Sequence, residues 1–186
     1  MPRLYLVAAI IACLVPGVPA HACRAPAELR LDDIRYASTV VVGRIVNYRL
    51  IRDEAFRRKI LASPRLSRAQ RKFYKAPDSL LTVDYARFGI VVDEVLAGRA
   101  AGTIAVTWGS PTLGGPSGMA SGRFLIALRD PASPIPPIRG PSATVLPARD
   151  PKSLTVLQAP CSGPFIFGAG SAEAREVRTI LSASSR

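Results

Sequence analysis

The 186-residue sequence predicts a mainly β fold: a five-stranded barrel with a basic helical insertion between strands 1 and 2 and a C-terminal helix. Three observations support this prediction. Five apolar stretches have strand-like patterns, of which residues 39–50 are rich in β-branched residues. The length suits one domain with a real core, and the last segment has helical apolar spacing. Five strands in one small domain favour a closed or nearly closed barrel over an open sheet.

The first 22 residues have the three parts of a secretory signal peptide. Arg3 supplies a positive charge, residues 4–18 form an uncharged apolar run, and Ala20-His21-Ala22 fits an A-x-A cleavage site. An uncleaved anchor is the alternative, but the run is shorter than the ~20 residues a membrane helix needs. We therefore expect cleavage after Ala22, a secreted or periplasmic protein, and a single domain over residues 23–186. No later segment is apolar for long enough to span a bilayer.

Cleavage would change the inventory of reactive residues. It removes Cys13 and leaves Cys23 and Cys161, an even pair that suggests one disulfide in an oxidising compartment. A lipidated Cys23 is the competing expectation, although Ala20 and His21 fit a lipobox poorly. Two free thiols are the third alternative, and we favour the disulfide.

The predicted elements follow in chain order. Residues 26–38 suggest a short helix or turn. Gly43 and the phase shift at Asp93-Glu94 predict bulges, and Gly98 should end the second strand. The five predicted strands are residues 39–50, 79–98, 102–110, 122–130 and 153–158.

Residues 171–184 predict the C-terminal helix. Ser171 suits its N-cap, and Val177, Ile180 and Leu181 form its apolar stripe. Among the loops, the Gly-rich stretch 112–122 lacks the Gly-Lys-Ser/Thr ending of a phosphate-binding loop.

Residues 49–77 form the most informative segment, with ten basic residues against two acidic ones. The pattern predicts two short helices separated at Ser63-Pro64, because Ser suits an N-cap and Pro the first helical position. Phe56 and Ile60 would share one face, and residues 66, 69 and 73 another.

Two interpretations of this insertion remain open. The helices could lie on the barrel with their basic side chains in solvent, or the concentrated charge could bind an anionic partner. The candidate anion-binding residues are Arg57, Arg58, Lys59, Arg65, Arg68, Arg71, Lys72 and Lys75.

The loss of His21 with the signal peptide removes the only histidine. A Ser-His-Asp or Cys-His mechanism and a histidine-based zinc site are then excluded. Neighbouring acids such as Asp93-Glu94 point to opposite faces of a strand and make a poor acid–base pair. We therefore expect no enzyme, no catalytic residues, no bound metal and no cofactor.

Several segments together resemble a known superfamily. They are Cys23 at the mature N-terminus, "STVVVGRIV", "RFGIVVDEVLAG", "TIAVTWGS", "GRFLIALR" and "APCSG" before a helix. They are similar to the OB-fold of the tissue-inhibitor-of-metalloproteinase and netrin-like (TIMP-like) superfamily, in its bacterial form, over most of residues 23–181. In the inhibitors, the mature N-terminal cysteine chelates the zinc of the target protease. Cys23 matches this cysteine and Arg24 follows it, but Ala25 stands where a second cysteine would be.

Two functions follow as expectations. The first is an exported, non-catalytic binding module whose insertion engages a polyanion, an acidic envelope component or a protein partner, since the corresponding OB-fold connection often binds oligonucleotides and oligosaccharides. The second is a protease-inhibitor-like protein that acts through Cys23 and Arg24.

Overall fold

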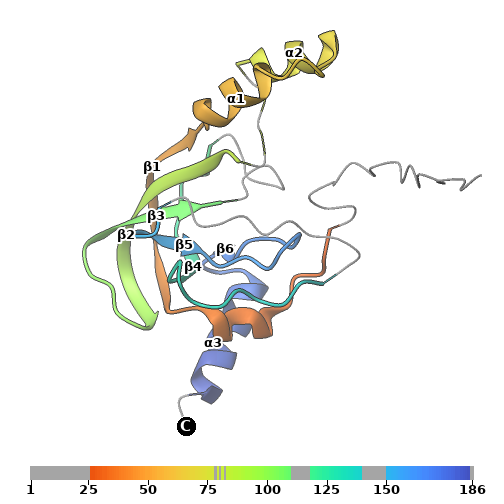
Figure 1. Ribbon diagram of the computed structural model, residues 1–186. Helices are drawn as coiled ribbons and strands as arrows, with labels where there is room; N and C mark the ends of the chain where they lie inside the picture. Colours follow the sequence, from red (N-terminus) through yellow and green to blue (C-terminus); the bar gives the residue numbers. More distant parts are fainter. Residues whose placement is uncertain are drawn as a thin grey trace, which may run out of the picture.

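A computed structural model describes residues 26–77, 79, 81, 83–109, 118–139 and 150–184 (Figure 1). Within these ranges the chain forms a β-barrel with helices at both ends. The elements in order are η1 (Leu31–Tyr36), β1 (Thr39–Ile51), α1 (Glu54–Leu61), α2 (Arg68–Lys75), β2 (Tyr85–Ala97), β3 (Thr103–Trp108), β4 (Phe124–Arg129), β5 (Leu154–Val156), β6 (Ile166–Gly168) and α3 (Ala172–Ser184).

The barrel closes because β1 pairs with strands on both of its sides. The strand order is β1-β2-β3-β5-β4, and β4 then pairs antiparallel with β1. Among the strands of the described ranges, only β3 and β5 run parallel; the other neighbours are antiparallel. The predicted five-stranded, OB-like barrel is confirmed. Strand β6 is an addition on β4 that the sequence did not predict, because three residues carry no readable alternation.

Gly43 lies where β1 pairs with β2 on one side and with β4 on the other. The β1–β2 register shifts between Val42 and Gly43, where Asp93 is the extra residue on β2. A Cβ at Gly43 would lie 2.4 Å from the carbonyl oxygen of Val91, so only glycine fits this close approach. The bulge predicted at Asp93-Glu94 is confirmed, and the irregularity predicted at Gly43 is the β1 side of the same bulge. Gly98 ends β2 with a φ of 75°.

Two apolar clusters hold the molecule together. One fills the barrel with side chains from all five barrel strands, including Phe88, Trp108 and Leu128. The other lies between the outer side of the barrel, η1 and α3, where Ile34 and Val177 are buried. The side chain of Ser171 caps α3 as predicted, accepting a hydrogen bond from the Ala174 backbone N–H at 3.2 Å.

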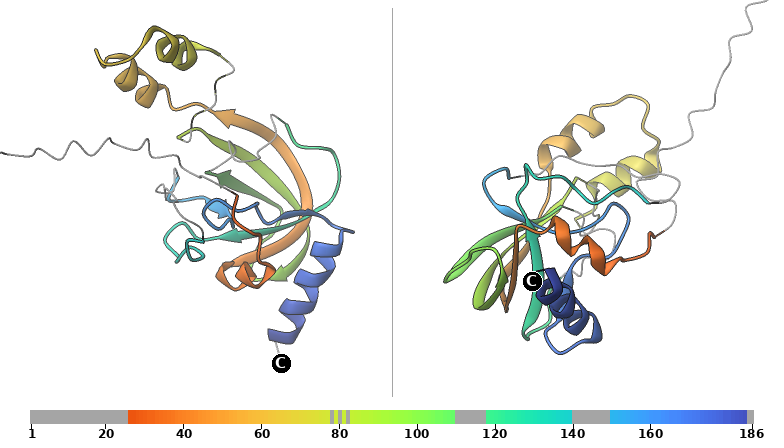
Figure 2. Two further views of the ribbon diagram at one scale, coloured as in Figure 1. Left: turned by 90° about the vertical axis from the view of Figure 1, so that its right-hand side faces the viewer. Right: turned by 90° about the horizontal axis from the view of Figure 1, so that it is seen from below.

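Helices α1 and α2 form a helical hairpin, residues 54–75, that projects from the barrel (Figure 1). It stands at the opposite end of the molecule from α3 (Figure 2). The interpretation that these helices lie on the barrel surface is therefore wrong. Within the described ranges no helix is long and apolar enough to cross a membrane.

The predicted start of the second helix is also wrong. Helix α2 begins at Arg68, and its N-cap is Ser67, four residues beyond Ser63. Ser67 and Gln70 form a complete capping box, with hydrogen bonds of 3.2 and 2.9 Å between each side chain and the other residue's backbone N–H. This reciprocal pair satisfies two N–H groups at once, whereas Ser63 alone could satisfy one.

Candidate functional site

The helical hairpin is anchored by a buried ion pair at its base. The Arg57 guanidinium contacts the Asp84 carboxylate, and their side chains are 2% and 0% exposed. Arg57 also donates to the carbonyl oxygen of Ser79 at 2.9 Å. Asp84 accepts hydrogen bonds from the backbone N–H groups of Asp53 and Leu81, at 2.9 and 2.7 Å. Asp84 thus joins the start of β2 to the start of α1.

This geometry removes Arg57 from the candidate anion-binding residues. Its charge is neutralised inside the protein, and its side chain is closed to a ligand in solvent. The prediction that Arg57 belongs to the binding surface is wrong for a physical reason: helical periodicity points it inward, toward Asp84. The sequence showed the positive charge but could not show this partner, which lies 27 positions away.

Arg71 has a second structural role. Its guanidinium donates to the carbonyl oxygens of Leu61 and Ser63, at 2.8 and 2.7 Å. These carbonyls lie at the end of α1 and in the turn after it, so Arg71 ties α2 to α1. Another arginine, Arg52, donates to the carbonyl oxygen of Pro77. This bond joins the segment that leaves α2 to the segment between β1 and α1.

The remaining six candidates, the hairpin cations, are exposed to solvent. None of them forms an ion pair with another residue in the described part of the chain. They are Arg58, Lys59, Arg65, Arg68, Lys72 and Lys75.

Two acids lie at the start of the hairpin, Asp53 as the N-cap of α1 and Glu54 as its first residue. The Asp53 side chain caps α1 by accepting a hydrogen bond from the Phe56 backbone N–H at 2.8 Å. Glu54 pairs with Arg52 at 3.1 Å. The exposed surface of the hairpin therefore keeps a strong positive field.

Aromatic side chains are interleaved with the hairpin cations. Phe56 is 36% exposed and Phe73 is 51% exposed. Phe73 meets Tyr74 edge to face, with 5.6 Å between the ring centroids. Because the hairpin stands away from the barrel, the barrel does not cover these apolar side chains (Figure 1).

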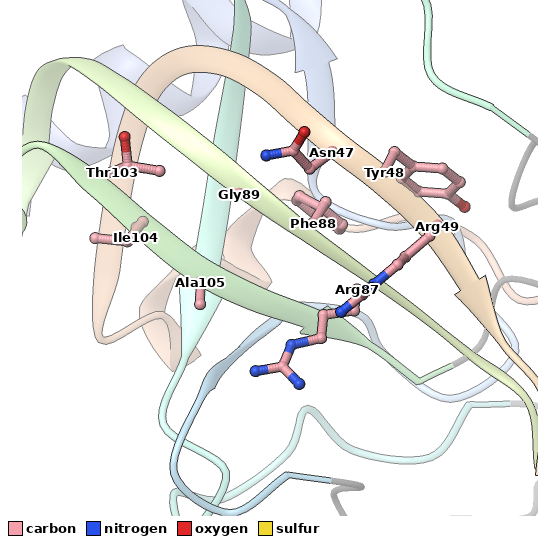
Figure 3. A pocket seen from close by; sticks show the side chains of 9 residues that line it. All are labelled: Asn47, Tyr48, Arg49, Arg87, Phe88, Gly89, Thr103, Ile104 and Ala105. Atoms are coloured by element: carbon pink, nitrogen blue, oxygen red, sulfur yellow. The ribbon is translucent and has the colours of Figure 1, made fainter.

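A groove of about 640 Å³ lies across β1, β2 and β3 (Figure 3). Arg49 and Arg87, at one end of it, are direct cross-strand partners. Sequence analysis missed this pair as a site. Strand alternation could have placed each arginine on an outer face, but the register that makes them neighbours depends on a bulge at Asn47, whose φ is 54°.

The expected N-terminal site lies outside the described residues, because Cys23 and Arg24 precede them. The first described residues run beside Cys161: the Ala27 backbone N–H donates to the Cys161 carbonyl oxygen at 2.8 Å. Ser162 Oγ donates to the carbonyl oxygen of Glu28 at 3.4 Å. Ala27 and Glu28 therefore lie beside Cys161 and Ser162, and the disulfide itself stays a prediction.

The Asp93-Glu94 carboxylates are engaged in structural ion pairs. Asp93 contacts Arg123 at 2.9 Å. Glu94 accepts two hydrogen bonds from Arg178 of α3, each 2.9 Å long, and these bonds lower the Glu94 pKa. No group of three or more His, Cys, Asp or Glu residues suited to a metal ion occurs in the described ranges.

Comparison of the chain with protein-family models, with curated proteins and with solved structures gave no significant match.

Proposed function

We propose that this protein is an exported, non-catalytic binding module that recognises an anionic partner through its helical hairpin. One observation carries the proposal. Six exposed cations project from the barrel on two helices and the turn between them, and none has an acidic partner among the described residues.

The distribution of charge supports binding over simple solubility. The hairpin, residues 54–75, holds eight Lys and Arg against one acid, in a chain whose formal net charge is +12. Charge needed only for solubility can be spread over a surface, whereas segregated charge gives a local field that attracts an anion. The field is concentrated on the element farthest from α3 (Figure 2).

The anchoring of the hairpin supports the same conclusion. Arg57, Arg71 and the capping box of α2 fix the helices to each other and to β2. A surface that is ordered before binding loses less conformational entropy when its partner arrives. The buried Arg57 therefore supports binding indirectly, because it fixes the helix that carries two of the hairpin cations.

The resemblance to the TIMP-like superfamily belongs to the proposal and agrees with a binding role. The OB-like barrel would be the scaffold, and the insertion between β1 and β2 would be the recognition element.

The test uses two variants with equal net charge. In the hairpin variant, Gln replaces Arg65, Arg68, Lys72 and Lys75; in the control, Gln replaces four exposed basic residues elsewhere, Arg30, Arg35, Arg99 and Lys152. Each purified protein is eluted with salt from immobilised heparin, a sulfated polysaccharide. We expect the hairpin variant to elute at clearly lower salt than the control. Equal elution of the two variants would show that net charge alone governs binding and would overturn the proposal.

A further inference from the structure

The groove across β1, β2 and β3 contains a pair of neighbouring arginines that does not stabilise the barrel. Arg49 and Arg87 stand directly opposite each other on neighbouring antiparallel strands. Like charges in this position destabilise a sheet. Arg87 approaches Asp150 only at 4.0 Å, and 44% of the Arg87 side chain is exposed.

A bulge in β1 creates this pairing. Val46 pairs with Gly89 and Arg49 with Arg87, so Asn47 and Tyr48 together oppose the single residue Phe88. Bulges re-aim side chains and are common next to functional sites. Without the extra residue, Arg49 would be shifted along β1 relative to Arg87. Figure 3 shows both arginine side chains at the groove.

The floor of the groove beyond the arginines is open. Gly89 and Ala105 are cross-strand partners, and neither carries a side chain longer than a methyl group. A Cβ at Gly89 would come within 3.0 Å of Val46 Cγ2, so the glycine also allows close packing of the strands. The volume of about 640 Å³ lies within the ~300–1,000 Å³ range of ligand sites.

The far end of the groove is polar and uncharged. Thr103 pairs with Val91, four residues along β2 from Arg87, which corresponds to roughly 13 Å at 3.3 Å per residue. Thr103 is exposed, and so is Asn47, which lies opposite Phe88 between Thr103 and the arginines (Figure 3). A hydroxyl and an amide suit hydrogen bonding to hydroxyl groups.

We propose that this groove binds a short acidic oligosaccharide. Its carboxylate or sulfate group lies between the Arg49 and Arg87 guanidinium groups, which favour planar, two-point contact with oxyanions. Its hydroxyl groups meet Asn47 and Thr103, and its body crosses the open floor.

A nucleic acid strand fits the groove less well, because base stacking needs an exposed aromatic face. Phe88 is 2% exposed, and Tyr48 stacks against it with 5.8 Å between ring centroids. The hairpin cations do not line the groove. Substitutions in the groove can therefore abolish binding there without changing the hairpin, and substitutions in the hairpin can do the reverse.

The experiment is a ¹⁵N–¹H NMR titration of the mature protein with trigalacturonate, and in a second arm with a heparin-derived disaccharide. We expect saturable shifts of the Asn47, Gly89 and Ala105 amides with at least one of the two probes. The arm that responds identifies the oxyanion as carboxylate or sulfate.

Arg49→Gln and Arg87→Gln should each weaken binding at least tenfold. Both should keep or raise the melting temperature, because each removes a like-charge repulsion. Ala105→Leu fills the floor without changing charge and should also weaken binding. Arg99→Gln is the matched control, because Arg99 is exposed and lies on neither the groove nor the hairpin; it should leave the affinity unchanged.

Four outcomes would overturn the proposal. They are no response to either acidic saccharide, equal binding of neutral maltotriose, unchanged binding by Arg87→Gln, and tighter binding of a single-stranded oligonucleotide to the same amides.

Discussion

Two arginines that are adjacent in the sequence have opposite roles. Arg57 is 2% exposed and paired with Asp84, while Arg58 faces solvent. The composition of the segment gives the positive charge of both but not the difference between them. Helical periodicity separates their faces, yet the buried partner depends on where β2 begins. This long-range contact lies beyond local sequence patterns.

Asp84→Asn should destabilise the protein strongly. Removing one partner of a buried pair leaves an uncompensated charge at Arg57, which typically costs about 3–5 kcal/mol. Chemical denaturation of the variant measures the loss. Arg58→Gln is the control, and as a surface change it should stay within about 0.5 kcal/mol of the parent. A parent-like Asp84→Asn variant would show that the pair does not anchor the hairpin.

Gly43→Ala should also destabilise the fold. The added methyl group would meet the Val91 carbonyl oxygen at 2.4 Å, and overpacking of this kind costs about 1–3 kcal/mol. Thermal unfolding compares it with Gly109→Ala, where a Cβ meets nothing within 4 Å. If both variants melt together, the bend of β1 does not require glycine.

At the scale of elements, local signals placed most strands and the bulge at Asp93. The β-branched run of β1 and the phase shift at Asp93-Glu94 depend on neighbouring residues, so the sequence shows them directly. The second strand was predicted from residue 79, but β2 begins at Tyr85 because Asp84 is committed to the hairpin base. The start of α2 was predicted wrongly because both Ser63 and Ser67 suit an N-cap. Gln70 favours Ser67, because it completes a capping box with Ser67.

The Glu94–Arg178 pair, which joins the β2 bulge to α3, should make stability depend on pH. Hydrogen bonds from Arg178 lower the Glu94 pKa in the folded state. The contribution is therefore present above the unfolded pKa of about 4.3 and is lost as pH falls through the folded value. Because the pair is exposed, we expect at most about 1 kcal/mol.

Urea denaturation at pH 7 and at pH 3 tests this expectation. Glu94→Gln should lower stability at pH 7, and its difference from the parent should shrink at pH 3. A difference that persists unchanged at pH 3 would contradict the electrostatic origin of the effect.

At the scale of the whole molecule, the barrel was predictable and its binding surfaces were less so. Closure of the barrel is expected when five strands fall in one small domain. The number of strands and the length of the chain can both be read from the sequence. The Arg49–Arg87 pair depends on cross-strand register, and the projection of the hairpin depends on the fit between helices and barrel. Neither property is encoded in a local window.

The mature chain should begin at Cys23, carry no lipid and contain one Cys23–Cys161 disulfide. The hydrogen bond between Ala27 and Cys161 brings this end of the chain to the expected partner. Such a bridge would close most of the chain into one loop, worth roughly 4–5 kcal/mol in the chain-entropy model. Intact mass before and after reduction and alkylation tests all three points. An added acyl mass, or two alkylated cysteines without reduction, would refute the assignment.

The salt dependence of polyanion binding tests the central claim, that the hairpin cations form one binding surface, most directly. With duplex DNA as the probe, log affinity should fall with log salt by about 0.9 per neutralised phosphate, so four contacts give a slope near −3.6. The variant with Gln at residues 65, 68, 72 and 75 should lose most of that slope, and the equal-charge control should keep it. Arg71 is left intact because it holds the two helices together. A hairpin variant with the parent's slope would contradict the account.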